Sequence, residues 1–192
     1  DLTRSRGLGD VYKRQMLDKV GIEPKFLNGL RVTDAATMEV VEQVLTGKVT
    51  KSIVSLISCA GGKAVGICGK DGNLLRGQVK SEELGFVGDV TQVNTSLIRE
   101  LVSVGYIPVV ATVAMDARGQ ALNVNADTAA GAIAAKLGAE KLILMTDVPG
   151  VCTDKDDPNT LIRELTMDET EKAISDGVIA GGMIPKVECC MN

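Results

Sequence analysis

The sequence has no histidine and no tryptophan, and it has only two phenylalanines and two tyrosines among 192 residues. The absence of histidine excludes the Ser-His-Asp triad, the Cys-His dyad and every histidine-based metal site. With so few aromatic side chains, a nucleic-acid surface that works by base stacking is disfavoured, and a net charge of −4 disfavours a phosphate-backbone binder. Chemistry in this chain must therefore use carboxylates, lysines, arginines, amides and backbone dipoles.

Other missing features exclude further kinds of protein and binding site. The longest apolar run covers residues 107–115, well short of the ~18 residues that span a bilayer, so no membrane partner is expected. The five cysteines include no CxxC pair, which favours reduced thiols over a disulfide framework or a Cys-only zinc site. Neither a Walker A motif nor a G-x-G-x-x-G motif occurs, so any nucleotide must be held by another device.

The residues that are present indicate an α/β protein. Apolar runs at 63–68, 107–113 and 141–145 predict strands, the last of them buried on both faces. Residues 74–79 and 85–93 predict a hairpin. Helical spacing predicts a helix after Asp34 that ends at Gly47, and further helices over 51–58, 94–104, 125–137 and 167–176, with a last one from Gly181. This alternation predicts a three-layer αβα sandwich with a mostly parallel central sheet.

The first fifteen residues differ from the rest. They carry four basic and two acidic side chains and show no apolar periodicity, whereas the remaining residues are net acidic. The reversal of charge predicts that residues 1–15 are a non-native or disordered leader, with a native flexible leader as the alternative. Residues 16–192 show no internal boundary and are expected to form one domain.

The most informative segment contains Asn123, Asn125 and Asp127, which alternate along an extended entry to a helix of small residues. One or two of these side chains are placed to bind a ligand while another caps the helix. The positive end of the helix would favour an anion there. The alternative is plain helix capping by Asn125 or Asp127.

Two further segments suit nucleotide chemistry. Residues 146–150 follow the predicted strand at 141–145, so Asp147 is placed to meet a ribose hydroxyl or an adenine amine, and Gly150 allows close approach of the backbone. Lys186 lies about one turn into the helix that Gly181 and Gly182 open, where an ammonium is placed to reach a transferring phosphate. The alternatives are an ordinary turn and a surface lysine.

Arg31 precedes a predicted helix start at Thr33 and Asp34. A guanidinium there is suited to a two-pronged bond with a carboxylate. The alternative is a solvent-exposed arginine beside a helix cap formed by Thr33 or Asp34.

Seven segments, taken together and in this order, are similar to those of a known family. They are residues 28–34, 66–72, 84–89, 105–108, 123–131, 144–150 and 181–187. The chain resembles the N-acetyl-L-glutamate kinases of the amino-acid kinase superfamily over residues 16–192. Residues 154–158 and 187–190 resemble the plant, algal and cyanobacterial branch.

The resemblance implies ATP-dependent phosphorylation of the side-chain carboxylate of N-acetyl-L-glutamate in arginine biosynthesis, with Mg²⁺ carried by ATP and no metal site of the protein's own. It also implies a homo-hexamer, L-arginine as a feedback inhibitor and a nitrogen-signalling regulatory protein as partner. The location would be the plastid stroma in a plant or alga and otherwise the cytoplasm. Two alternatives stay open: another amino-acid kinase, acting on aspartate, glutamate or carbamate, and a non-catalytic nucleotide- or regulator-binding module.

The resemblance also implies roles for individual residues. Arg31 would bind the α-carboxylate of the substrate, and Leu30, Asn123 and Asn125 would complete the substrate site. Asp127 would organise two catalytic lysines, of which Lys186 is one. The ATP-binding residues would be Thr146, Asp147, Val148, Pro149, Gly150, Val151, Cys152, Gly181, Gly182, Met183 and Lys186.

One feature departs from the family pattern. In the family, an N-terminal strand carries the other catalytic lysine beside glycine-rich turns, and nothing similar precedes Arg31 in this sequence. The family's domain also continues beyond the position of Asn192. We therefore expect residues 16–192 to be a partial amino-acid kinase domain and the 192-residue chain alone to lack turnover.

Overall fold

The computed structural model describes residues 8–27, 30–145, 150–154 and 157–191. Eight strands are present among them: β1 (Phe26–Leu27), β2 (Leu30–Arg31), β3 (Ala64–Cys68), β4 (Leu75–Val79), β5 (Gly88–Val93), β6 (Ile107–Ala111), β7 (Val113–Met115) and β8 (Ala121–Asn123). The α-helices are α1 (Leu8–Lys19), α2 (Ala35–Glu42), α3 (Thr50–Cys59), α4 (Ser96–Ser103), α5 (Ala126–Leu137), α6 (Met167–Ser175) and α7 (Ile184–Met191). Shorter or wider helical turns are η1 (Gln43–Val49), η2 (Asp71–Asn73), η3 (Glu82–Leu84), η4 (Pro158–Thr160) and η5 (Gly181–Met183).

The strands form an antiparallel pair, β1 with β2, a parallel pair, β3 with β6, and a mixed four-stranded sheet. β3 and β6 run parallel, with Ala64 opposite Ile107 at one end and Cys68 opposite Ala111 at the other. The larger sheet has the order β5-β4-β7-β8, in which β4 is antiparallel to β5 and parallel to β7, and β7 is antiparallel to β8. The predicted hairpin of 74–79 with 85–93 is therefore confirmed, as is the α/β class.

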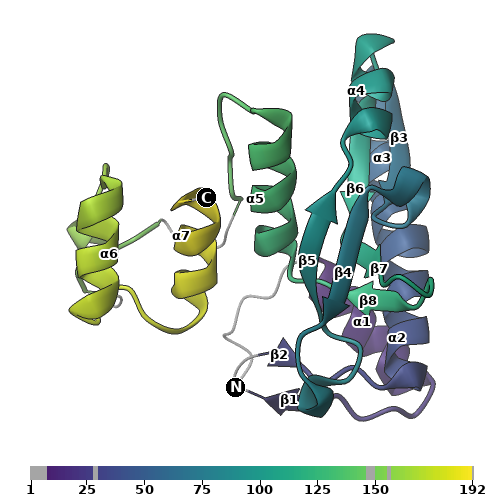
Figure 1. Cartoon of the computed structure of the whole chain (residues 1–192), viewed down its shortest axis with the longest axis horizontal. Coiled ribbons are helices and arrows are strands. Elements are labelled where there is room, and N and C mark those ends of the chain that lie inside the picture. Colours follow the sequence, from purple (N-terminus) through teal and green to yellow (C-terminus); the bar gives the residue numbers. More distant parts are fainter. Residues whose placement is uncertain (1–7, 28–29, 146–149, 155–156, 192) are drawn as a thin grey trace.

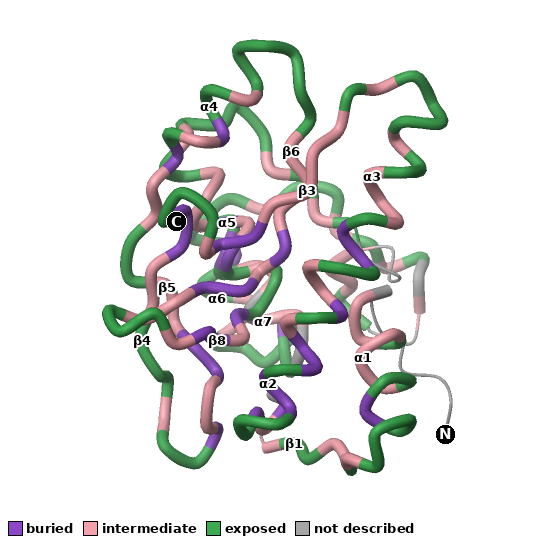
Figure 2. Tube along the Cα trace, turned by 90° about the vertical axis from the view of Figure 1, so that its right-hand side faces the viewer, coloured by how far each residue is buried: buried purple, intermediate pink, exposed green. Residues whose placement is uncertain are grey.

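Helices cover both faces of these strands (Figure 1). On one face α2 packs against the strands through a buried cluster of Met38, Val41, Cys68, Ala111, Val113 and Ala121. On the other face α4 and α5 close a second cluster of Leu74, Leu75, Ile98, Ala114, Leu122, Val124 and Ala129. The purple segments of Figure 2 gather along these strands and α2. The predicted layering of helix, sheet and helix is thus present.

The helix predicted to end at Gly47 continues instead. α2, η1 and α3 form one uninterrupted helical run from Ala35 to Cys59, in which η1 is a wider π-type turn. Glycine in a helix interior costs about 1 kcal/mol relative to alanine. Val44 and Val49, on either side of Gly47, are buried with Leu17 of α1 and Val40 of α2. Burial of this stripe favours continuation over the break that glycine alone predicts.

The predicted buried strand at 141–145 is not formed. Ile143 is 79% exposed and Met145 is 95% exposed, and the segment has no regular structure. A parallel strand needs neighbours to pair its backbone groups and cover its faces. Among the described residues, no strand is paired with this segment. The apolar pattern is typical of a buried strand, but the strand forms only where a neighbouring strand pairs with it.

Part of the predicted leader lies within the described residues. Helix α1 begins at Leu8, so the described residues 8–15 are helical. The helix is anchored by Leu17, which is fully buried against α2 and η1. Whether residues 1–15 are native stays a prediction. None of the helices in the described ranges combines the length and the apolar composition that crossing a bilayer requires.

Candidate active site

Two charged side chains from distant parts of the chain meet at the start of α5. The Asn125 side chain caps this helix by accepting a hydrogen bond from the backbone N–H of Thr128 at 3.1 Å. Asp127 then lies in the first turn of the helix. Lys186 of α7 donates from Nζ to Oδ2 of Asp127 at 2.8 Å, and the two side chains are 28% and 22% exposed. Lys186 is therefore not the free surface lysine of the alternative interpretation.

Arg31 is buried, with only 4% of its side chain exposed, so the alternative of a solvent-exposed arginine is wrong. Its Nη2 donates to Oδ1 of Asp10 in α1 at 2.6 Å, and its guanidinium lies 4.8 Å from the centre of the Phe26 ring. Among the described residues, the buried Nε and Nη1 have no hydrogen-bond partner. A buried donor without a partner is rare and destabilising. These two nitrogens can therefore donate hydrogen bonds to an anionic or carbonyl oxygen of a ligand.

Thr33 links Arg31 to Asn123. The side-chain amide of Asn123, at the end of β8, donates to Oγ1 of Thr33 at 3.2 Å, and that hydroxyl donates to the backbone oxygen of Arg31 at 3.0 Å. Thr33 is fully buried. Sequence reasoning considered Thr33 only as a helix cap, whereas Asp34 caps α2 by accepting from the backbone N–H of Thr37 at 2.8 Å.

Residues 84–86 pack against Thr33 through a close approach at Gly85. The backbone N–H of Thr33 donates to the oxygen of Leu84, and the N–H of Phe86 donates to the oxygen of Thr33 at 2.7 Å. Gly85 has φ = +65°, and a Cβ there would lie 2.4 Å from the Thr33 oxygen. Only glycine fits this conformation and this close approach. The signal was present in the segment 84–89, but it was not assigned to the site.

The surroundings of Arg31 are rich in positive charge. Lys13 of α1 lies with its Nζ 3.8 Å from Oδ1 of Asp10, which also accepts from Arg31. Burial lowers the pKa of Lys13, and the nearby Arg31 lowers it further, while Asp10 acts in the opposite direction. Two cations thus share one carboxylate, an arrangement that favours the approach of a second anion.

The predicted ATP-binding residues are only partly described. Thr146, Asp147, Val148 and Pro149 lie outside the described residues. Of the following three, Val151 accepts from the backbone N–H of Ile162 at 2.8 Å, and Cys152 forms an antiparallel bridge with Leu161. Gly181, Gly182 and Met183 form η5, which leads directly into α7 and Lys186. Leu30 belongs to β2, where it pairs with Leu27.

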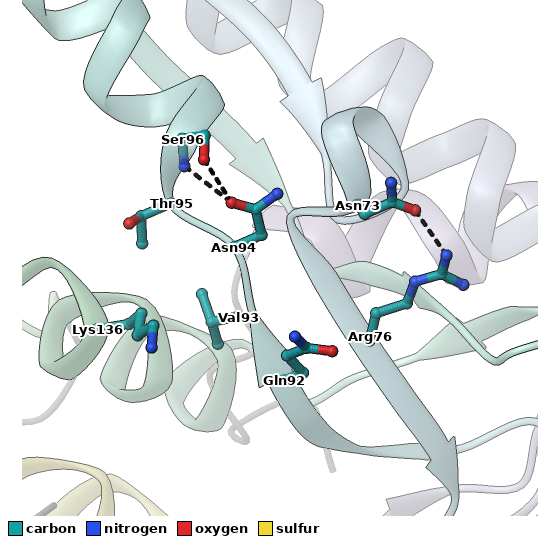
Figure 3. Close-up of a pocket in the computed structure, with 8 residues that line it drawn as sticks. All are labelled: Asn73, Arg76, Gln92, Val93, Asn94, Thr95, Ser96 and Lys136. Carbon is teal, nitrogen blue, oxygen red and sulfur yellow. Dashed lines mark hydrogen bonds between the residues drawn. The ribbon is translucent and has the colours of Figure 1, made fainter.

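A shallow polar hollow of about 560 Å³ lies elsewhere, between the end of the β4–β5 hairpin, the start of α4 and Lys136 (Figure 3). Its polar groups are largely satisfied by one another. Asn94 accepts from Ser96, and Arg76 donates to Asn73 at 2.7 Å. Lys136 lies in the last turn of α5, whereas Asp127 lies in the first. The hollow is therefore separate from the site of Arg31, Asn123 and Asp127.

Comparison with known proteins identifies the family of the chain. The model of the Amino acid kinase family matches residues 6–192. The chain belongs to this family. Residues in the match include both partners of the Asp127–Lys186 pair and the Arg31–Thr33–Asn123 chain. The resemblance that the seven sequence segments predicted is thereby confirmed.

Relatives in the amino acid kinase family give a narrower likeness. An acetylglutamate kinase of Thermosynechococcus vestitus is 62% identical over 177 residues, which are 92% of this chain and 60% of the relative. One of Nostoc sp. is 60% identical with the same coverage. The chain thus spans 60% of the length of these curated relatives. Among solved structures, smu.665 of Streptococcus mutans UA159 superposes with a TM-score of 0.82 at 32% identity, covering 93% of this chain and 72% of the other.

No group of three or more histidine, cysteine, aspartate or glutamate side chains that could hold a metal ion occurs in the described ranges. Within them, the site therefore consists of one carboxylate–ammonium pair, one buried guanidinium and the amides of Asn123 and Asn125. Such groups position anions and neutralise charge, and they suit phosphoryl transfer.

Proposed function

We propose that this chain is part of an acetylglutamate kinase, which transfers the γ-phosphoryl group of ATP to the side-chain carboxylate of N-acetyl-L-glutamate. The observation that carries the proposal is a buried Arg31, two of whose nitrogens have no partner within the described part of the chain, joined through Thr33 to Asn123. Asn123 and Asp127 lie four residues apart, at the end of β8 and the start of α5. The names of the cyanobacterial relatives support the same assignment.

The described residues suit the two ends of such a substrate. Arg31 would bind the α-carboxylate through a free nitrogen, and the amides of Asn123 and Asn125 would bind the neighbouring groups. A side-chain carboxylate oxygen then attacks the γ-phosphorus. A phosphorus–oxygen bond to the substrate forms, and the bond between the γ-phosphorus and the bridging oxygen breaks, which leaves an acyl phosphate and ADP.

Lys186 and Asp127 would serve the transfer itself. Phosphoryl transfer depends on positioning and on neutralising negative charge more than on a base, so a site without histidine is adequate. The Lys186 ammonium would stabilise the charge that develops on the transferred group, and Asp127 would hold that ammonium in place. Asp127 would also organise a second lysine from a preceding strand of the family's domain.

ATP would enter with its Mg²⁺, which neutralises phosphate charge when bound. Mg²⁺ is usually held by substrate phosphates together with one or two carboxylates. Residues 146–152 and 181–183 would contact the nucleotide, and residues 181–183 directly precede the helix of Lys186.

The assembly and regulation of the protein follow from the same proposal. A homo-hexamer, inhibition by L-arginine and binding of a nitrogen-signalling protein are the states expected of a family member of the cyanobacterial and plant branch. The plastid stroma is the expected location in a plant or alga, and the cytoplasm otherwise.

A chimera tests the proposed activity. Residues 16–192 would replace the matching segment of the Thermosynechococcus vestitus acetylglutamate kinase, which supplies the remaining 40% of that protein's length. We expect ATP-dependent acyl phosphate formation, trapped as hydroxamate, with N-acetyl-L-glutamate and not with aspartate, glutamate or carbamate. Asp127→Asn should abolish most of it, and the 192-residue chain alone should give none.

The outcomes separate the alternatives. Preference for another acceptor would assign a different amino-acid kinase. A folded chimera that binds ATP without turnover would support a non-catalytic binding module. Turnover by the 192-residue chain alone would contradict the requirement for a second lysine.

A further inference from the structure

Helices α5 and α7 are in close contact where Gly131 faces Cys189. A Cβ placed on Gly131 would lie 2.6 Å from the backbone oxygen of Cys189, 2.9 Å from its Cβ and 3.2 Å from its Cα. Gly131 and Cys189 are both buried. Because the nearest atom is backbone and not the end of a flexible side chain, a methyl group at residue 131 could be accommodated only if the helices moved apart.

This contact lies one helical turn from the Asp127–Lys186 pair on both helices. Asp127 precedes Gly131 by four residues on α5, and Lys186 precedes Cys189 by three on α7. Residues three and four apart share one face of a helix. The two helices lie side by side, with α7 on the outer side of α5 (Figure 1). The Cys189 thiol also donates to the backbone oxygen of Lys186 at 3.0 Å, which ties this turn of α7 together.

We propose that Gly131 is a positioning residue, whose missing side chain lets α7 come close enough for Lys186 to reach Asp127. The importance of that pair for phosphoryl transfer rests on the proposed function. The closeness itself is a property of the helices. The close contact at Gly131 sets the separation of the two helices, and this separation allows the 2.8 Å bond between Lys186 and Asp127.

The chain offers a matched control glycine. Gly47 also lies inside a helical run, but a Cβ added there would meet nothing within 4 Å. Gly47→Ala and Gly131→Ala therefore make the same chemical change in a helix, with and without a close neighbour. Both variants change helix propensity in the same way, whereas only Gly131→Ala is expected to push two helices apart.

The experiment measures how fast an N-hydroxysuccinimide ester acylates Lys186 in the 192-residue chain, with Lys136 of α5 as the internal reference, by peptide mass spectrometry. An amine engaged by a carboxylate and only 28% exposed is less open to the reagent than a free one. Gly131→Ala should raise the relative rate at Lys186 about two- to fivefold, the size expected for a partly exposed ion pair. Gly47→Ala should leave it unchanged.

A double-mutant cycle separates positioning from general loosening. Asp127→Asn alone should raise the Lys186 rate, and adding Gly131→Ala to it should raise the rate no further, because the bond is already lost. A Gly131→Ala chain that keeps its circular dichroism spectrum and its Lys186 rate would overturn the proposal. So would an effect that persists undiminished in the Asp127→Asn background.

A second pair of variants covers the case in which Gly131→Ala does not fold. Cys189→Met enlarges the same contact from the α7 side, and Cys190→Met makes the same change at an exposed neighbour. The first should raise the Lys186 rate and the second should not, and equal rates would overturn the proposal. None of these readouts uses turnover, so absence of kinase activity in the chimera would contradict the proposed function and leave this inference standing.

Discussion

The two halves of the candidate site are supported very differently. The three buried clusters all lie between Leu17 and Ala129, and one of them contains Leu122 and Val124 on either side of Asn123. Arg31 and Thr33 are themselves buried. After α5, the buried apolar side chains among the described residues are Ile179 and Cys189, while Ile143 and Met145 are largely exposed. The half with Arg31, Thr33 and Asn123 is buried beside this core, whereas the half with Lys186 rests on helix α7, which packs against α5.

This difference has a physical consequence. Segments with few buried apolar contacts open locally at lower free energy than segments in a core. The position of Arg31 is fixed by β-bridges and buried hydrogen bonds, such as those of Thr33 with Leu84 and Phe86. The position of Lys186 is fixed by one ion pair and one close helix contact. Lys186 therefore lies on the less supported of the two halves.

The largest expected effect is a loss of stability from a substitution in the core. Leu122 is fully buried in the cluster that α4 and α5 share. Leu122→Ala should lower the free energy of unfolding by about 2–5 kcal/mol, from lost burial and a residual cavity. Denaturant unfolding followed by circular dichroism measures it. Ile179→Ala provides the comparison: it should speed hydrogen exchange in α6 and α7 and leave the exchange of β4 and β7 unchanged. Equal effects on both regions would contradict the difference in support.

The next effect concerns turnover. Lys186→Ala in the chimera should lower kcat by roughly 10²-fold, because the ammonium acts on charge that develops in the transition state. The KM for N-acetyl-L-glutamate should change little. Steady-state kinetics check both quantities, and Lys136→Ala on α5 is the control. A near-normal kcat would return Lys186 to the role of a structural ion pair.

A smaller effect is expected on the substrate side. Arg31→Lys in the chimera should raise the KM for N-acetyl-L-glutamate on the order of tenfold, since a charge-assisted bond is worth roughly 1.5–3 kcal/mol. The KM for ATP should stay nearly constant. Arg118→Lys, at a side chain 86% exposed, is the matched control. If the acetylglutamate KM of the Arg31 variant equalled that of the control, Arg31 would not bind substrate.

How far the sequence predicted the molecule depends on how local each determinant is. The start of α5 at Asn125 and its end at Gly138 were predicted correctly, because caps act within a few residues. The continuation through Gly47 and the unformed strand at 141–145 depend on neighbours elsewhere in the chain.

The same distinction explains the site. The family resemblance implied that Lys186 and Asp127 act together, and the structure brings them together across 59 positions. The bond between Asn123 and Thr33 spans 90 positions and had no sequence signal of its own. Asp10, in the segment predicted to be a non-native or disordered leader, accepts a hydrogen bond from Arg31 across 21 positions. Contacts of this kind are set by tertiary packing, which local patterns do not encode.

The smallest expected effect concerns the cap of helix α6, which lies in the less supported region after α5. Helix α6 begins with a capping box: the backbone N–H of Thr166 donates to Oε2 of Glu169 at 2.8 Å, and the N–H of Glu169 donates to Oγ1 of Thr166 at 3.3 Å. The hydrogen bonds that Thr166 donates to the Glu169 carboxylate, backbone first and hydroxyl second, hold the pKa of Glu169 below its ordinary value. With so little core after α5, local capping contributes much of what defines this helix.

The sign of the pH dependence follows from that direction. A carboxyl whose pKa is lower in the folded chain stabilises it fully above the ordinary glutamate value, and the contribution is lost as pH falls through the lowered value. Amide exchange in α6, corrected for the intrinsic pH dependence of exchange, should therefore speed up slightly on acidification. Glu169→Gln should show the faster exchange already at neutral pH and lose the pH step, whereas Glu171→Gln on the same helix should keep it. Retention of the step in Glu169→Gln would assign it to another carboxyl and remove the capping box as the support of α6.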